Sequence, residues 1–181
     1  TGGPLLYRNM RDGTFRNVAA EVGLAVEGSL RAAAAGDVNK DGYVDFFLGA
    51  AGTSWLALSD GRGAYAVSAA PEGTADAQAA QIVDYDADGL LNLLVATTNG
   101  MRLYRNLGNW KFEDVTAAVG LDRPLFYTHG AAAADYDRDG WPDLLVTGWG
   151  RLALYHNEPD GKGGRRFVEV TQKAGLTDIL W

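Results

Sequence analysis

The sequence predicts an all-β fold built from repeated units of four antiparallel strands. Two observations carry this prediction: an acidic motif recurs three times, and short apolar runs bounded by glycine or asparagine surround each copy. The copies are GDVNKDGYVD (36–45), VDYDADGLLN (83–92) and ADYDRDGWPD (134–143), and their first aspartates are 47 and 51 residues apart. No segment shows sustained helical periodicity.

Two further motifs recur in the same order and phase. The first is LYRN at 6–9 and 103–106, LYHN at 154–157, and a degenerate LALSDG at 56–61. The second is TFRNVAAEVGL at 14–24, KFEDVTAAVGL at 111–121 and RFVEVTQKAGL at 166–176, which allows one short helical turn at most. Three motifs in one phase indicate a true structural repeat.

Each repeat predicts four strands. The first strand is rich in alanine and precedes the acidic loop, at 31–36, 77–83 and 129–134. The second follows the loop, at 44–50, 91–97 and 142–148. The third and fourth lie at 55–59 and 64–68, at 101–106 and 111–115, and at 151–157 and 166–170. Four-strand repeats of about 40 to 50 residues are typical of β-propeller blades. Small alanine side chains suit the strands that crowd around a propeller's channel.

The repeats divide the chain into about three and a half blades. The division is a half-blade at 1–28, which supplies only a third and a fourth strand, and blades at 29–75, 76–122 and 123–181. Closed propellers have about 4 to 8 blades, so we expect this chain to need further blades from a longer chain or another subunit. Two copies would each carry the same unpaired half-blade, so simple complementation does not close the ring.

Composition excludes several classes of protein. The 181 residues carry a net charge of -7, which argues against nucleic-acid binding because that would need a basic patch. No apolar run approaches the roughly 18 residues that span a membrane, and no leader opens the chain, so we expect no membrane insertion and no visible signal peptide. Cysteine is absent, which excludes disulfides and thiolate chemistry.

The acidic loops place oxygen donors at matched positions. Counted from the first aspartate, positions 1, 3, 5 and 9 carry Asp or Asn, position 6 is glycine, and a backbone carbonyl at position 7 completes the set. Hard cations such as calcium take six to eight oxygen ligands. The candidate ligands are Asp37, Asn39, Asp41, Tyr43 and Asp45; Asp84, Asp86, Asp88, Leu90 and Asn92; and Asp135, Asp137, Asp139, Trp141 and Asp143. We expect about three calcium ions, one per full blade.

The acidic loops do not fit an EF-hand, which needs a Glu at position 12 and flanking helices. Position 12 is Leu48, Val95 or Val146, each within a predicted strand. A solvated acidic turn stays an alternative, because Asp and Gly are common turn residues. Magnesium suits the loops less well than calcium because it demands octahedral geometry, and catalytic carboxylates would not recur in every repeat.

The charge balance favours bound ions. Three calcium ions would change the net charge from -7 to -1. Binding energy would then become folding energy, so calcium should raise the melting temperature and chelation should lower it. We expect the middle loop to bind most weakly, because it closes with Asn92 in place of an aspartate.

These motifs resemble a known family. The repeated DxDxDGxxD on a hairpin resembles the FG-GAP/VCBS repeats of integrin-α-like β-propellers. The phrase LYRNLGNWKFEDVTAAVGL (103–121) is similar to the ASPIC/UnbV group, which includes cartilage acidic protein. The resemblance implies a calcium-bound propeller, usually extracellular or periplasmic, that serves in adhesion or protein interaction. Asn39, Asn92 and the degenerate second unit depart from the pattern.

Candidate ligand-binding residues lie at equivalent positions of the first strands. His129 lies six residues before Asp135, and the same offset gives Arg31 and Gln78. If the register holds, these three side chains form a polar ring at a mouth of the channel; the alternative is that they face solvent at strand starts. His156 replaces the Arg of an LYRN repeat, so we expect a structural role.

Two function classes remain. No serine–histidine–acid set, P-loop or glycine-rich nucleotide fingerprint is present, so we expect no enzymatic activity. The first class is a calcium-stabilised scaffold for protein interaction or adhesion. The second is a carbohydrate-binding propeller, a lectin or part of a polysaccharide-active enzyme, because Trp55, Trp141 and Trp149 near predicted turns could stack on sugars. The alternative for these tryptophans is packing between blades.

Overall fold

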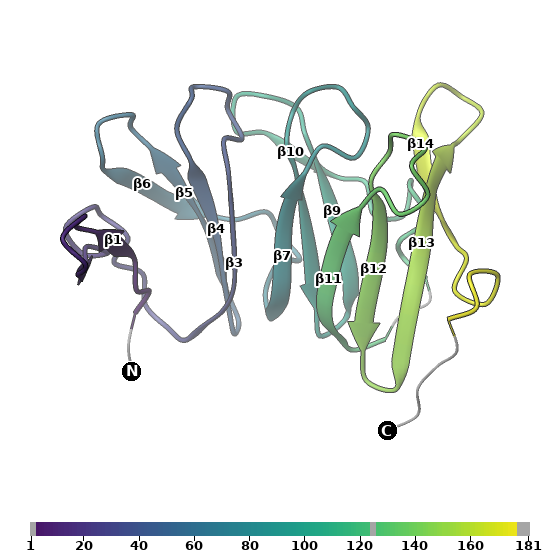
Figure 1. Ribbon diagram of the computed structural model, residues 1–181, viewed down its shortest axis with the longest axis horizontal. Coiled ribbons are helices and arrows are strands. Elements are labelled where there is room, and N and C mark those ends of the chain that lie inside the picture. Colours follow the sequence, from purple (N-terminus) through teal and green to yellow (C-terminus); the bar gives the residue numbers. More distant parts are fainter. Residues whose placement is uncertain (1–2, 124–125, 177–181) are drawn as a thin grey trace.

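The regular structure consists of β-strands. The computed structural model describes residues 3–123 and 126–176, and within these ranges the strands form one two-stranded and three four-stranded antiparallel sheets. Figure 1 shows the sheets side by side in chain order, from the half-blade near the N-terminus to the last sheet near the C-terminus. The predicted all-β fold of about three and a half propeller blades is confirmed.

Each full sheet is a meander whose strands follow the chain order. The half-blade consists of β1 (Tyr7–Asn9) and β2 (Phe15–Asn17). The first full sheet has β3 (Leu30–Gly36), β4 (Asp45–Ala50), β5 (Ser54–Ser59) and β6 (Tyr65–Ala69). The second has β7 (Ala77–Val83), β8 (Asn92–Thr97), β9 (Gly100–Asn106) and β10 (Phe112–Asp114), and the third has β11 (Thr128–Ala134), β12 (Asp143–Gly148), β13 (Arg151–Pro159) and β14 (Arg165–Glu169).

The blade boundaries stay a prediction, and the outermost parts of that division, residues 1–2 and 177–181, lie outside the described residues. Within the described ranges no helix has the length and apolar character that crossing a bilayer requires. The expected short helical turns occur as single turns after β2, β10 and β14. In the second sheet, for example, Val119 N donates to Val115 O at 2.9 Å.

The alanine-rich strands β3, β7 and β11 approach one another closely (Figure 1). A Cβ added to Gly49 on β4 would lie 2.6 Å from Ala77 Cβ on β7, and one added to Gly36 would lie 2.7 Å from Ile82 Cγ2. The Gln81 side chain on β7 accepts a hydrogen bond from Ala133 N on β11 at 2.7 Å. Small residues in these strands therefore allow the inner edges of successive sheets to meet.

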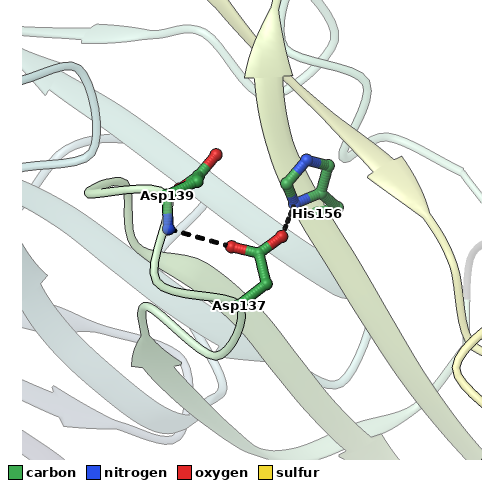
Figure 2. A group of neighbouring side chains, drawn as sticks. All are labelled: Asp137, Asp139 and His156. Atoms are coloured by element: carbon green, nitrogen blue, oxygen red, sulfur yellow. Dashed lines mark hydrogen bonds and ion pairs between the residues drawn. The ribbon is translucent and has the colours of Figure 1, made fainter.

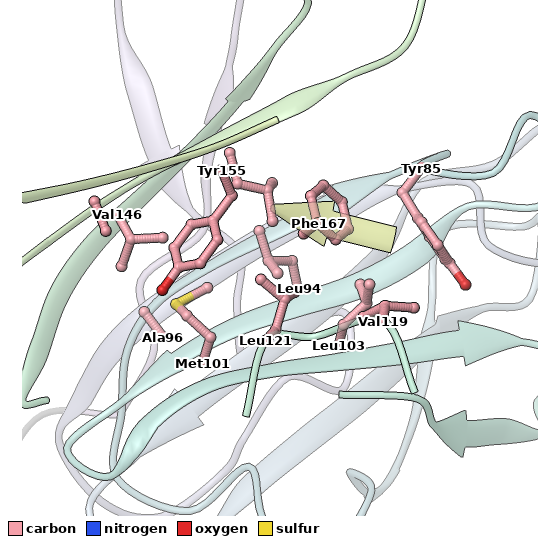
Figure 3. Packing of buried hydrophobic residues seen from close by; sticks show 12 residues of the cluster. Tyr85, Leu94, Ala96, Met101, Leu103, Val119, Leu121, Val146, Tyr155 and Phe167 are labelled. Atoms are coloured by element: carbon pink, nitrogen blue, oxygen red, sulfur yellow. The ribbon is translucent and has the colours of Figure 1, made fainter. Parts of the chain in front are cut away.

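The hydrophobic core lies between the sheets. Side chains alternate along a strand, so Leu93 and Val95 on β8 pack toward the first full sheet with Phe47. Leu94 on the same strand packs with Leu144 of the third sheet, within the cluster drawn in Figure 3. Both faces of β8 are covered, and all its residues are buried.

The two ends of the molecule carry apolar faces. The half-blade exposes Leu5, Tyr7 and Phe15, with exposed fractions of 65%, 57% and 63%. At the other end, Leu145 and Leu154 line an open cavity of about 650 Å³. Their repeat equivalents in the second sheet, Leu94 and Leu103, are 0% exposed because the third sheet covers them.

Candidate metal sites

Each acidic loop joins the first strand of a full sheet to the second, and the three loops fold alike. The carboxylate at position 1 accepts a hydrogen bond from the glycine N at position 6, at 2.8, 3.0 and 2.9 Å in the three loops. The carboxylate at position 5 accepts one from the backbone N at position 7, at 2.8, 2.8 and 2.9 Å. Backbone N–H groups of each loop therefore point inward, toward the loop's own carboxylates.

Two backbone positions make this conformation possible. Position 4 is left-handed, with φ of 60° at Lys40, 53° at Ala87 and 67° at Arg138. Position 6 is also left-handed, and glycine adopts that conformation without the steric cost of a Cβ. A non-glycine residue with positive φ is uncommon and marks a constrained turn. Its repetition at one position in three loops shows that the turn is a regular feature of the repeat.

The closing residue at position 9 is buried and connects the loop to the third strand. Asp45 is 2% exposed, and its two oxygens accept hydrogen bonds from Ser59 N at 2.9 Å and Val38 N at 3.1 Å. Asp143 is 1% exposed and accepts one from Asn157 N at 2.8 Å. Burial raises the pKa of the Asp45 carboxyl, an effect the two hydrogen bonds partly offset. A nearby cation would favour the ionised form.

The donor atoms lie close enough to share one ion. One carboxylate oxygen each from Asp84, Asp86 and Asp88 lies within 4.8 Å of the others, and so do oxygens of Asp135, Asp137 and Asp143. Asp84 Oδ1 is buried and has no hydrogen-bond partner within the described residues. A buried polar atom without a partner is costly, and a cation would satisfy it. The residues present thus fit a hard, oxygen-seeking ion.

The first loop differs in having Asn39, whose side-chain N donates to Asp41 Oδ2 at 2.8 Å while its Oδ1 accepts from Asp41 N at 3.1 Å. An Asn oxygen is also a calcium ligand. The ligand roles of all fifteen residues stay a prediction.

The third strand places a different side chain opposite each loop. In the second sheet Arg105 Nε lies 3.1 Å from Asp86 Oδ2, an ion pair without hydrogen-bond geometry, and Arg105 Nη2 lies 3.4 Å from Asp88 Oδ2. In the third sheet His156 Nδ1 lies 3.0 Å from Asp143 Oδ1 and 3.4 Å from Asp137 Oδ2, as Figure 2 shows for Asp137.

Sequence reasoning placed Arg105 and His156 in a strand motif and did not connect them with the acidic loops. The sequence shows only that both directly precede the asparagine of the L-Y-x-N motif. Their place beside the loop follows from strand pairing, because the backbone N of that asparagine binds the closing residue of the loop.

The asparagine of this motif joins neighbouring sheets. Asn106 Nδ2 donates to Val38 O of the preceding acidic loop at 2.7 Å, and to Leu91 O of its own sheet at 2.9 Å. Asn157 repeats the arrangement with Tyr85 O at 2.9 Å and Pro142 O at 3.1 Å. The first and second acidic loops are thus held both by their own sheet and by the asparagine of the following sheet.

The three residues of the predicted polar ring occupy one structural position. Arg31, Gln78 and His129 each lie where the pairing of the first strand with the second shifts register. Arg31 and His129 are exposed, whereas Gln78 is half-buried and its Nε2 donates to Asp76 O at 3.0 Å. Their role in ligand binding stays a prediction.

The tryptophans differ in exposure. Trp149 is 81% exposed and lines a cleft of about 440 Å³ with Tyr127 and His129. The Trp141 ring is stacked by the Arg165 guanidinium, whose carbon lies 3.8 Å from the ring centroid. Trp55 packs against the core between the half-blade and the first full sheet. Trp149 therefore has the most accessible ring of the three.

Comparison with known proteins decides the family. The family model described as the FG-GAP-like repeat matches residues 37–95 and 84–146, two overlapping copies that together run from the first acidic loop to β12. This chain belongs to the FG-GAP-like repeat family. The two matches start at Asp37 and Asp84, so each FG-GAP-like repeat is counted from its acidic loop.

The chain of FG-GAP-like repeats is also similar to cartilage acidic protein 1. The mouse protein is 32% identical over 68 residues, which cover 38% of this chain and 10% of that protein. The Xenopus tropicalis protein is 33% identical over 78 residues, covering 41% and 12%. The matched part thus spans about a tenth of these relatives. The predicted resemblance to integrin-α-like and ASPIC/UnbV repeats is confirmed.

A solved structure shares the fold. It is an Agrocybe aegerita lectin, described for its specific recognition of non-reducing terminal N-acetylglucosamine, and it superposes with a TM-score of 0.53. The match has 22% identity and covers 97% of this chain but 46% of the lectin chain. At that identity the likeness supports the β-propeller fold.

Proposed function

We propose that this chain is part of a calcium-stabilised β-propeller that serves as a scaffold for protein interaction or adhesion. The observation that supports it is the loop fold repeated three times, in which the carboxylates at positions 1 and 5 accept backbone hydrogen bonds at matched positions. In the second and third loops three carboxylates also lie within 4.8 Å of one another. Bound calcium would neutralise these carboxylates and hold the inner hairpin of each blade against its third strand.

Calcium titration tests this proposal. Isothermal calorimetry on the chelator-treated chain should show binding of about three ions, and Asp139→Ala should remove the ion of the third loop. Asp122→Ala, a change of equal charge outside the loops, should leave the number of ions unchanged. Absence of calcium binding at millimolar concentration would contradict the proposal.

We further propose that the chain is not enzymatic and acts outside the cytoplasm, in an extracellular or periplasmic setting. Extracellular calcium-binding modules bind the ion with a dissociation constant of roughly 10⁻⁴–10⁻³ M. Open loops that offer only a few carboxylates suit an affinity in this range. The family resemblance favours the same setting. Detection of the full-length protein in the secreted or periplasmic fraction would support this, and retention in the cytoplasm would contradict it.

The two apolar end faces support further blades as partners. Tyr104 packs toward the first full sheet with Phe47 and Leu56, and its repeat equivalent Tyr7 is exposed. Leu145 and Leu154 are the equivalents of the covered pair Leu94 and Leu103. Each end therefore carries half of an interface that occurs complete inside the chain. Blades of a longer chain or of another subunit would bury both faces.

Carbohydrate binding is the second candidate function. The exposed Trp149 ring, beside Tyr127 and His129 in one cleft, supports it, because aromatic rings stack on the apolar faces of sugars. The likeness to a lectin shows the fold and adds the suggestion of a glycan ligand. Screening on a glycan array with wild type, Trp149→Ala and the remote control Tyr7→Ser tests it. A glycan signal lost only in Trp149→Ala would favour this function over the scaffold.

A further inference from the structure

The residue of the third strand that lies opposite the end of each acidic loop differs among the three sheets. Strand register gives the opposition: Phe46 pairs with Ala57, Leu93 with Tyr104 and Leu144 with Tyr155. In an antiparallel pair, the residue before a paired position on the second strand lies opposite the residue after its partner on the third strand. The facing residues are therefore Leu58 for Asp45, Arg105 for Asn92 and His156 for Asp143.

In the middle loop the facing residue is a permanent cation beside the expected ligands. Arg105 contacts Asp86 and Asp88 at 3.1 and 3.4 Å, and the Asp86 side chain is 11% exposed. The first loop has an uncharged Leu58 at this position. Guanidinium stays protonated at any physiological pH, so the middle loop always carries this charge.

The closing residue of the middle loop adds donors to the same place. Asn92 Oδ1 accepts from Asn106 N at 2.8 Å, which turns its amide nitrogen toward the loop. That nitrogen lies 3.3 Å from Asp86 Oδ1 and 3.2 Å from Leu90 O. Both oxygens of Asp86 and the position-7 carbonyl are thus near nitrogen donors, whereas Asp84 Oδ1 has no partner within the described residues. The middle loop is stabilised in part without an ion.

We propose that Arg105, the third-strand residue that faces the middle acidic loop, makes the calcium site of this loop weak by supplying part of the positive charge that the ion would supply. The inference rests on the proposed function, since it presumes that the loops bind calcium. It assigns Arg105 a role in lowering the calcium affinity of the middle loop, beyond the effect of Asn92 in place of an aspartate. Arg105 repels the incoming divalent ion and stabilises the loop when the ion is absent.

Neutralising Arg105 tests this role directly. Calcium titration of wild type should show a weak binding step besides the tight ones, and Arg105→Gln should strengthen that step roughly tenfold, the ratio for a unit charge about 6 Å from a divalent ion in water. The control is Arg102→Gln on the same strand, whose side chain contacts Met101 O. It removes an equal charge away from the loop, so it should leave the weak step unchanged.

The reciprocal change is Leu58→Arg, which should weaken the first loop by a similar factor. Melting in chelator gives a second readout: Arg105→Gln should lower the melting temperature without calcium and regain it when calcium is saturating. If one of these two substitutions prevents folding, the other still tests the inference. The more conservative Arg105→Lys gives a further test, because it keeps the charge and should therefore keep the weak step.

The outcomes separate this inference from the proposed function. If wild type binds no calcium, the proposed function fails and takes the inference with it. If wild type binds calcium but Arg105→Gln leaves the weak step unchanged, only the inference is overturned. A weaker middle site in Arg105→Gln also overturns it, because Arg105 would then be a positioning residue that orients Asp86 for the ion.

Discussion

The side-chain amide of Asn157 donates a hydrogen bond of 2.9 Å to the carbonyl of Tyr85, which lies 72 residues earlier in the acidic loop of the preceding sheet. The same amide donates to Pro142 O, and Asn157 is 0% exposed. Asn106 makes the equivalent pair of bonds. In the second and third sheets one asparagine therefore joins the acidic loop of the preceding sheet to its own sheet, so loop order and blade packing should be coupled.

Replacing Asn157 by Ala should destabilise the chain by about 3 kcal/mol, because the buried Tyr85 carbonyl and the half-buried Pro142 carbonyl lose their donor. Chemical denaturation followed by tryptophan fluorescence measures this change. Asn9→Ala is the matched control: it removes the same motif position from the exposed half-blade, where the side chain accepts one bond from Arg11 N. Its cost should stay near half a kcal/mol, roughly that of a surface change. Equal costs at the two positions would contradict the role of Asn157 between sheets.

Leu94 and Leu145 hold the same place in successive repeats and should respond differently to truncation. Leu94→Ala should cost about 3 kcal/mol because it opens a cavity between two sheets. Leu145→Ala should cost about 1 kcal/mol or less in this chain, because the residue lines an open cavity. Denaturation curves of the two variants decide the matter. A cost for Leu145→Ala as large as that of Leu94→Ala would show that its face is already covered.

Two kinds of aspartate turn should differ in their dependence on calcium. Asp139 belongs to the third acidic loop, whereas Asp160 closes an ordinary hairpin by accepting bonds from Lys162 N at 2.6 Å and Gly164 N at 2.9 Å. These bonds lower the pKa of the Asp160 carboxyl without any need for an ion. Asp139→Ala should reduce the rise in melting temperature that calcium causes. Asp160→Ala should lower the melting temperature equally with and without calcium.

Much of the fold could be predicted because each motif occurs in several copies, which can be compared within one sequence. The acidic loops, the alternating apolar strands and the alanine-rich inner strands recur in phase, and the strands of all three sheets formed where they were expected. The inner strands illustrate the physical reason. Alanine favours helices as an isolated residue, yet Gly36 and Gly49 show that larger side chains would not fit where the sheets meet.

The contacts that arise between elements could not be predicted from spacing alone. Arg105 meets Asp86 only because strand pairing brings residues 19 positions apart to one edge of the sheet. The bond from Asn157 to Tyr85 depends on how two sheets pack, which no single repeat encodes. The register shifts at Arg31, Gln78 and His129 likewise arise from pairing. Sequence reasoning found their common position but not the irregularity that displaces them.

Thermal melting with and without calcium tests the central claim most directly. Differential scanning fluorimetry of the chain in millimolar calcium, in magnesium, and in EDTA should give a melting temperature that is highest with calcium and several degrees lower with EDTA. An ion that binds the native state stabilises it by about 1.4 kcal/mol per site when calcium is at ten times the Kd. Magnesium should have little effect. The same melting temperature in all three conditions would contradict the assignment of the acidic loops as structural calcium sites.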